Sequence, residues 1–241
     1  MFRGNRDNLT CMQRLAPIGL WLTAMVILAA VPAHAQTMQV WPEIDTYLKV
    51  NDRTRIFLQA AAVAHDGDAT ESDFGVNLDL HLKLLRRKHE LLARLDESKN
   101  RAFMVRGGYR YVHSHTGGEN EHRGIAETTT RYPLTAPLGD ILLSDRNLVD
   151  FRDIGGAYSW RYRNRLSAER ELSAGRLRVN PYARYEISYD SRHDDWSRTE
   201  WRVGSSFQVH KISELDAYFA WQNNTGKAQT RAIGVTLTFY F

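Results

Sequence analysis

The stretch "GVTLTFYF" (Gly234–Phe241) decides the fold. Apolar residues alternate here with small or polar ones, which is the period of a β-strand. The apolar face begins at Ile233 and continues through Val235, Leu237, Phe239 and Phe241. Chain ends are more commonly polar and mobile, so an apolar terminal strand needs apolar surroundings. A half-buried strand of a soluble sandwich and a lipid-facing strand of a membrane barrel both meet that need.

The segment Met1–Ala35 is predicted to be a cleaved secretory signal. It carries three arginines, then the apolar run Leu15–Val31, then Ala33-His34-Ala35, which fits a small-residue cleavage site. An uncleaved anchor helix is the alternative, but Pro17 and Pro32 interrupt or directly follow the apolar run. We therefore expect export through the Sec pathway and a single domain over residues 36–241.

Composition limits how the exported domain can be stabilised. Cys11, the only cysteine, lies within the predicted signal, so the exported chain can form no disulfide. No later run of about 18 apolar residues provides a second membrane helix, so a membrane-spanning domain must be a β-barrel. The mean hydropathy of −0.47 suits a barrel that averages an apolar and a polar face. The net charge of +4 includes the predicted signal, so the remaining chain is near balance and gives no case for nucleic acid binding.

Alternating segments separated by turn residues fill the rest of the chain, which is typical of a transmembrane, antiparallel, up-and-down β-barrel. Tyr and Trp gather at the ends of the apolar faces, as in interfacial girdles. We expect about twelve strands, or ten if Glu90–Leu95 joins a neighbour. The other strands are Val40–Val50, Thr54–Ala64, Asp73–Leu85, Phe103–His113, Arg123–Tyr132, Ile141–Arg152, Tyr158–Leu166, Leu177–Tyr189, Ser197–Val209, Leu215–Trp221 and the closing stretch from Ile233.

An even number of strands would place both chain ends in the periplasm. The polar loops Ser114–His122 and Asp190–Trp196 would then face the outside of the cell. We expect a monomer surrounded by outer-membrane lipid.

The opposite faces of these strands carry mostly arginine, interleaved with carboxylates. One interpretation is a cross-strand ladder of Arg–carboxylate bonds that fills a narrow barrel. The other is a positively lined path that favours small anionic solutes. The residues predicted to line the lumen and set its selectivity are Arg106, Arg110, Arg146, Asp150, Arg152, Arg161, Arg163, Arg165, Arg178, Arg184, Glu186, Arg198, Glu200 and Arg202.

Three blocks of sequence carry a resemblance to a known family. They are "PLTAPLGDILLSDRNLVDFR" (Pro133–Arg152), "WRYRNRLSAERELSAG" (Trp160–Gly175) and "NPYARYEISYDSRHDDWSRTEWRVG" (Asn180–Gly204). In this order they resemble the bacterial outer-membrane β-barrel family catalogued as domain of unknown function 2490, over nearly the whole exported chain. Leu148 departs from the pattern, because a polar residue is expected after "DRN".

The resemblance implies an exported outer-membrane barrel of a Gram-negative bacterium and implies no activity. The terminal stretch with Val235, Leu237, Phe239 and Phe241 also resembles the signal read by the barrel-assembly machinery during insertion. The closing strand is thus predicted to be both a lipid-facing wall and an insertion signal.

Histidines at the outer rim offer the only sign of catalysis. His113-Ser114-His115 could set a histidine beside a serine nucleophile, and His193 lies beside two aspartates. His81 is expected to belong to the polar filling of the lumen. No zinc-ligand spacing or phosphate-binding loop is found, so we expect no metal and no cofactor.

The sequence therefore predicts a porin-like barrel that acts as a passive or weakly anion-selective channel with an Arg-rich lumen. The alternatives are a lipid- or peptide-processing enzyme that uses a rim histidine and a plugged structural barrel.

Overall fold

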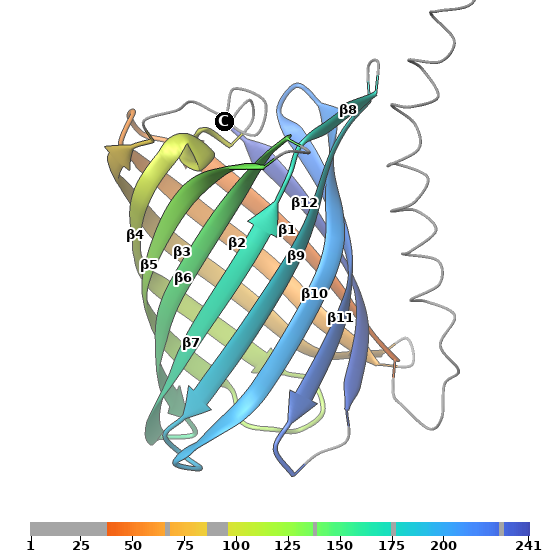
Figure 1. Cartoon of the computed structure of the whole chain (residues 1–241). Coiled ribbons are helices and arrows are strands. Elements are labelled where there is room, and N and C mark those ends of the chain that lie inside the picture. Colours follow the sequence, from red (N-terminus) through yellow and green to blue (C-terminus); the bar gives the residue numbers. More distant parts are fainter. Residues whose placement is uncertain (1–37, 66–67, 86–95, 137–138, 175–176, 227–228) are drawn as a thin grey trace, which may run out of the picture.

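The computed structural model describes residues 38–65, 68–85, 96–136, 139–174, 177–226 and 229–241. They form one sheet that closes on itself as a barrel and is antiparallel except where its first and last strands meet (Figure 1). The elements are β1 (Met38–Lys49), β2 (Thr54–His65), β3 (Asp68–Leu84), the 3-10 turn η1 (Glu97–Asn100), β4 (Arg101–Ser114), β5 (Glu121–Ala136), β6 (Gly139–Ile154), β7 (Ala157–Glu169), β8 (Leu172–Ala174), β9 (Leu177–Asp190), β10 (Asp195–His210), β11 (Ser213–Asn224) and β12 (Thr230–Tyr240).

The predicted fold class is confirmed, but eleven strands close the barrel instead of about twelve. The short β8 pairs with the first residues of β9 and continues the line of β7, so it does not count as a separate strand of the barrel wall. The strand expected near Glu90–Leu95 lies outside the described residues. Every other expected strand matches a barrel strand.

The odd number of strands changes how the barrel closes. β1 pairs with β12 in parallel, with Val40 opposite Ile233 and Tyr47 opposite Tyr240, whereas all other neighbours are antiparallel. The start of β1 and the end of β12 therefore lie at opposite ends of the barrel. The expectation that both ends share one side of a membrane is wrong, because it rested on an even strand count.

The two open ends of the barrel differ in their connections. We call C-terminal mouth the end that holds Phe241, η1 and the turns 50–53 and 211–212, and far mouth the end that holds the turns 115–120, 155–156 and 191–194. At the far mouth, Gly155 and Gly156 join β6 to β7 with φ values of +58° and +84°. A two-residue turn with two positive φ angles matches the twist of the flanking strands, which explains the glycine pair.

The exterior of the barrel is predominantly apolar. β3 presents Phe74, Val76, Leu78 and Leu80, and the closing strand presents Ile233, Val235, Leu237 and Phe239, followed by Phe241. Aromatic side chains gather outside towards both ends, with Tyr158, Trp160 and Trp196 at the far mouth and Tyr132 and Phe241 nearer the other. The predicted apolar face of the last strand is thus confirmed as an exterior wall.

Candidate functional site: the arginine-filled lumen

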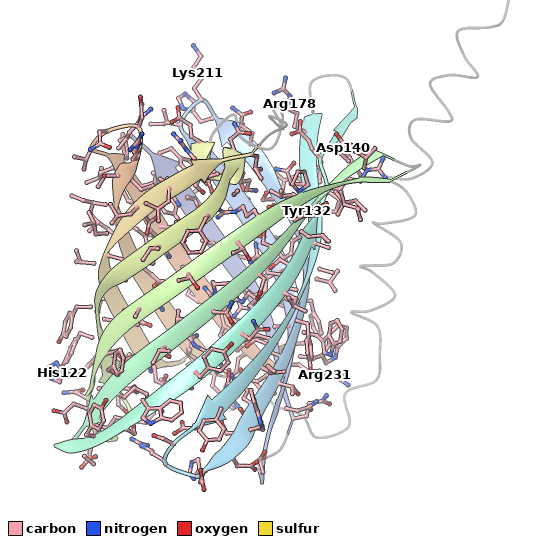
Figure 2. All side chains as sticks on the ribbon, turned by 60° about the vertical axis from the view of Figure 1, so that its left-hand side comes forward. His122, Tyr132, Asp140, Arg178, Lys211 and Arg231 are labelled. Atoms are coloured by element: carbon pink, nitrogen blue, oxygen red, sulfur yellow. The ribbon has the colours of Figure 1, made fainter. Side chains whose placement is uncertain are left out.

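The interior of the barrel is filled by charged side chains from strands β2 to β11 (Figure 2). Alternation along each strand sends these side chains inward, as the sequence predicts. Their carboxylates are almost fully buried, with Asp79 and Asp150 at 0% exposure and Glu186 at 2%. A buried charge is tolerated only when it is paired, so the contacts of these groups define the site.

Glu186 on β9 is the most heavily paired carboxylate. Its Oε2 accepts from Arg165 Nε at 2.7 Å and from Arg146 Nη2 at 3.1 Å. Its Oε1 accepts from Arg198 Nη2 at 3.1 Å, and Arg163 Nη1 lies 3.8 Å away. One side chain thereby ties together β6, β7, β9 and β10.

A second group of ion pairs continues towards the far mouth. Asp150 accepts from Arg163 Nη2 at 3.1 Å, and Arg161 Nε lies 3.5 Å from the same carboxylate. Arg152 contacts Glu121 and donates through Nη1 to Asp190 Oδ2 at 2.7 Å. These pairs join β5 to β9 across the intervening strands.

A third group lies towards the C-terminal mouth. Arg106 binds Asp79 through two bonds of 2.6 and 2.9 Å, and Arg55 Nε donates to the same carboxylate at 2.7 Å. Arg55 also reaches Asp96, just before η1, at 2.7 Å. The guanidinium of Arg106 lies 4.1 Å from the centre of the Phe57 ring, so it makes a cation–π contact as well.

The remaining predicted lumen residues have weaker or separate contacts. Arg110 lies 3.8 Å from Asp73, and Arg184 stacks on Tyr182 with its guanidinium 3.8 Å from the ring centre. Arg202 contacts Glu200 and lies over Tyr218 of β11. Arg178 lies apart from this network, near the C-terminal mouth (Figure 2).

Several members of the network are absent from the predicted set. They are Arg55, Glu121, Arg123, Glu127 and Asp190. Arg55, Arg123 and Glu127 share the alternation of the predicted residues, so the period of their strands would have found them. Glu121 and Asp190 lie in segments expected to be loops, whereas the structure makes them the ends of β5 and β9. Leu148 is fully buried in the lumen, where it faces Arg163 on β7 and Glu127 on β5 in the strand register.

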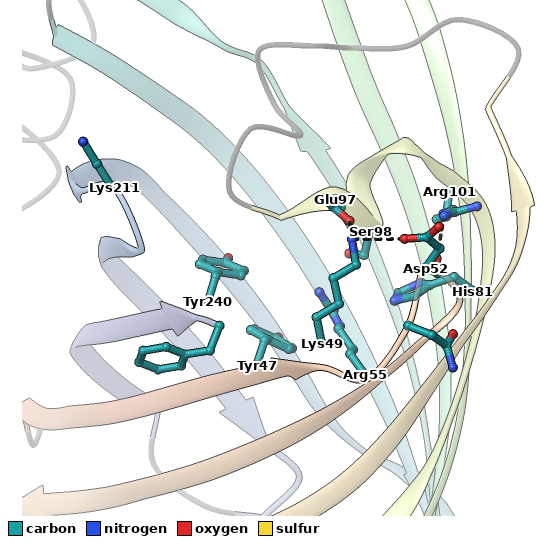
Figure 3. A pocket seen from close by; sticks show the side chains of 12 residues that line it. Tyr47, Lys49, Asp52, Arg55, His81, Glu97, Ser98, Arg101, Lys211 and Tyr240 are labelled. Atoms are coloured by element: carbon teal, nitrogen blue, oxygen red, sulfur yellow. Dashed lines mark hydrogen bonds and ion pairs between the residues drawn. The ribbon is translucent and has the colours of Figure 1, made fainter.

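A cavity of about 240 Å³ opens at the C-terminal mouth (Figure 3). Tyr47, Tyr240, His81 and Ser98 are among the side chains that line it. Lys49 Nζ spans its edge, 2.8 Å from Glu97 and 3.2 Å from Asp52.

The connection that carries η1 is held to the barrel by charge. Burial alone would raise the pKa of Asp96, but Arg55, Arg131 and Lys99 outweigh it and hold this pKa well below its ordinary value. Burial would likewise lower the pKa of Lys99, yet the Glu169 carboxylate at 2.7 Å helps to raise it above its ordinary value. Both groups therefore stay charged at neutral pH.

The rim histidines lie outside the barrel near the far mouth, in a different arrangement from the predicted one. Ser114 Oγ accepts from Gly118 N at 3.1 Å, and among the described residues it makes no hydrogen bond to either neighbouring histidine. His115 Nε2 instead lies 2.8 Å from Ser72 Oγ on β3, and His113 Nδ1 lies 2.8 Å from Asn120 Oδ1. His193 belongs to the separate turn between β9 and β10, where its backbone N donates to Asp190 O.

The described residues contain no helix long and apolar enough to cross a membrane. Within the same residues, no group of three or more His, Cys, Asp or Glu side chains could hold a metal ion. No protein-family model matches the chain, and no curated protein matches it either.

Proposed function

We propose that the protein is an outer-membrane β-barrel of a Gram-negative bacterium whose lumen is sealed by its Arg–carboxylate network. The apolar exterior, with aromatic side chains towards both ends, supports insertion in a bilayer. The resemblance of the three sequence blocks to the uncharacterised outer-membrane family points the same way.

The pairing of Glu186 with four arginines carries the proposal of a sealed lumen. A conducting pore lined by arginine needs guanidinium groups that face water and are available to passing anions. Here the arginines contact buried carboxylates, and their charges are largely compensated. Opening a path would separate several buried pairs, each of which costs about 3–5 kcal/mol when one partner is lost. The geometry therefore favours the plugged barrel over the passive or weakly anion-selective channel.

Single-channel conductance of the refolded chain 36–241 in planar bilayers tests this proposal. Heat-modifiable migration in electrophoresis first establishes that the inserted protein is folded. We expect the folded protein to be silent in a salt gradient. Stable steps with anion preference, reduced when Arg161, Arg163 and Arg165 become Gln, would instead make the lumen a conduction path.

A second candidate function is hydrolysis at the far mouth, and the 2.8 Å contact between Ser72 Oγ and His115 Nε2 favours it. A serine beside a histidine base can act as a nucleophile on an ester. Among the described residues, no third side chain orients His115 through a hydrogen bond, so the pair alone falls short of a triad. Release of fatty acid from lipid vesicles that is lost in both Ser72→Ala and His115→Ala, but not in His193→Ala, would establish this activity.

A further inference from the structure

Polar side chains on strands β5, β6 and β7 form a cluster within the apolar exterior. Three polar side chains point outward here, namely Asp145 and Asn147 on β6 and Asn164 on β7. Their neighbours in the sequence, Arg146 and Arg163, point into the lumen, and adjacent residues of a strand face opposite sides. Asn164 Nδ2 donates to Asp145 Oδ1 at 2.6 Å and to Asn147 Oδ1 at 3.0 Å. We call these three side chains, together with Thr130 beside them on β5, the exterior polar patch.

The patch lies near the middle of the barrel's height. Asp145 is close to the centre of β6 (Gly139–Ile154), and Asn164 is close to the centre of β7 (Ala157–Glu169). Exposed Leu143 and Leu166 lie on its side towards the C-terminal mouth. Exposed Phe151 and Trp160 lie on its side towards the far mouth. The patch is therefore enclosed within the apolar band and does not belong to a polar rim.

The rest of the exterior shows how unusual this place is. On the opposite wall, mid-strand exterior positions are held by Ile44, Leu58 and Val235. A carboxylate or an amide that faces lipid at mid-height is unfavourable because hydrocarbon offers it no hydrogen bonds. Polar groups at such a depth mark a surface that faces something other than lipid.

The unused hydrogen-bonding groups of the patch indicate what it faces. Both N–H groups of Asn164 are used, and Asn147 Oδ1 accepts from Asn164 and from Tyr162 Oη at 2.5 Å. Within the described chain, the Asn147 Nδ2 donors and the acceptors Asp145 Oδ2 and Asn164 Oδ1 make no hydrogen bond. Donors and acceptors thus lie side by side on two adjacent strands, so the patch is complementary to itself.

We propose that two copies of this chain associate in the membrane through the exterior polar patch. The proposal rests on the membrane location proposed above, and it departs from the monomer that the sequence predicts. Around a two-fold axis through the patch, the Asn147 amide of one copy donates to the Asp145 or Asn164 oxygen of the other, and the reverse bond forms by symmetry.

The surface beside the patch permits close approach. Gly107 on β4 pairs with Ala126 on β5, and Ala126 pairs with Val149 on β6. A Cβ added to Gly107 would meet no atom nearer than 3.9 Å, so no side chain covers the backbone of the barrel wall at this point. Small residues at a membrane interface let two backbones come close enough for polar side chains to meet.

Cysteine cross-linking tests the dimer cleanly, because the chain 36–241 contains no cysteine. Leu166→Cys lies at the edge of the patch, and Ile44→Cys on β1 is its control on the opposite wall, where the isoleucine is similarly exposed. Both are refolded separately into phosphatidylcholine vesicles and treated with a short bismaleimide. We expect a dimer band several-fold stronger for Leu166→Cys than for Ile44→Cys. Equal or absent bands would overturn the proposal.

A second measurement separates this proposal from the membrane location. Asn147→Leu/Asn164→Leu is compared with the unchanged protein by sedimentation in mild detergent, after heat-modifiability shows that both are folded. We expect a dimer for the unchanged protein and a monomer for the variant. An unchanged protein that inserts into vesicles but sediments as a monomer overturns the dimer alone. A folded protein that stays in solution without detergent or lipid overturns the membrane location too.

Discussion

The ring of Tyr218 on β11 lies directly against the backbone of Gly234 on β12. The two residues face each other in the strand register, and a Cβ on Gly234 would come within 2.0 Å of the ring carbon Cζ. Tyr218 is itself 5% exposed and belongs to a buried cluster with Tyr182 and Ala220. The glycine in the closing strand therefore provides the space in which an interior tyrosine is packed.

Replacing Gly234 by Ala is expected to lower the free energy of unfolding by about 1–3 kcal/mol, because the ring must shift within a filled interior. Gly124→Ala on β5 is the matched control, since nothing lies nearer than 3.7 Å to a Cβ there. Urea unfolding in lipid vesicles measures both. Equal stabilities for the two variants would show that Tyr218 moves aside without cost.

Replacing Glu186 by Gln is expected to destabilise the barrel by about 3–5 kcal/mol, because it leaves Arg146, Arg165 and Arg198 without their shared carboxylate. Glu71→Gln makes the same chemical change at an exposed position of β3 and should alter stability by no more than about 0.5 kcal/mol. The measurement is again the urea midpoint in vesicles. A Glu186→Gln variant as stable as Glu71→Gln would contradict the role of Glu186 as the centre of the network.

The stability of the barrel is expected to fall in acid partly through Asp96. The pKa of Asp96 is held below its ordinary value in the folded protein, so its contribution is complete above the ordinary carboxyl pKa of about 4 and is lost as the pH falls further. Asp96→Asn should be less stable at neutral pH and should lose less stability on acidification than the unchanged protein. Unfolding midpoints measured from pH 7 to pH 3 would reveal parallel curves if Asp96 played no part.

Labelling from outside the cell tests the orientation expected from the sequence. Glu119→Cys lies in the far-mouth turn between β4 and β5, and Lys211→Cys lies in a turn at the C-terminal mouth. A membrane-impermeant maleimide applied to intact cells should label Glu119→Cys alone, and both variants should react after lysis. Labelling of Lys211→Cys alone would reverse the orientation.

The inward and outward faces of the strands could be predicted because a period of two is a local property of the sequence. The number of strands could not be predicted in this way, because a segment becomes a strand only when it pairs with its neighbours. Nothing within the sequence of a single strand indicates whether the total is even or odd. The partners of Glu186 come from three further strands, so their convergence depends on register and barrel closure. In the sequence, the exterior polar patch is indicated only by Asn164, a polar residue among the otherwise apolar outward positions of its strand.

The contact of Ser72 with His115 shows the same limit. The sequence places Ser114 between two histidines, but neighbouring residues on a strand point to opposite faces. The serine that does meet a histidine comes from β3, and the register between β3 and β4 brings it there. Adjacency in sequence was misleading for this reason.

The parallel seam between β1 and β12 also determines when the barrel can finish folding. Every other strand pair joins neighbours in the chain, whereas this pair joins Met38–Lys49 to Thr230–Tyr240 across nearly the entire domain. Contacts between such distant segments carry the largest loop-closure entropy and form slowly. Until they form, β1 and β12 each expose an unpaired edge that can recruit another strand. The assembly of this barrel is therefore most vulnerable at its last step, and a catalyst of insertion would act most usefully by holding these two edges until they meet.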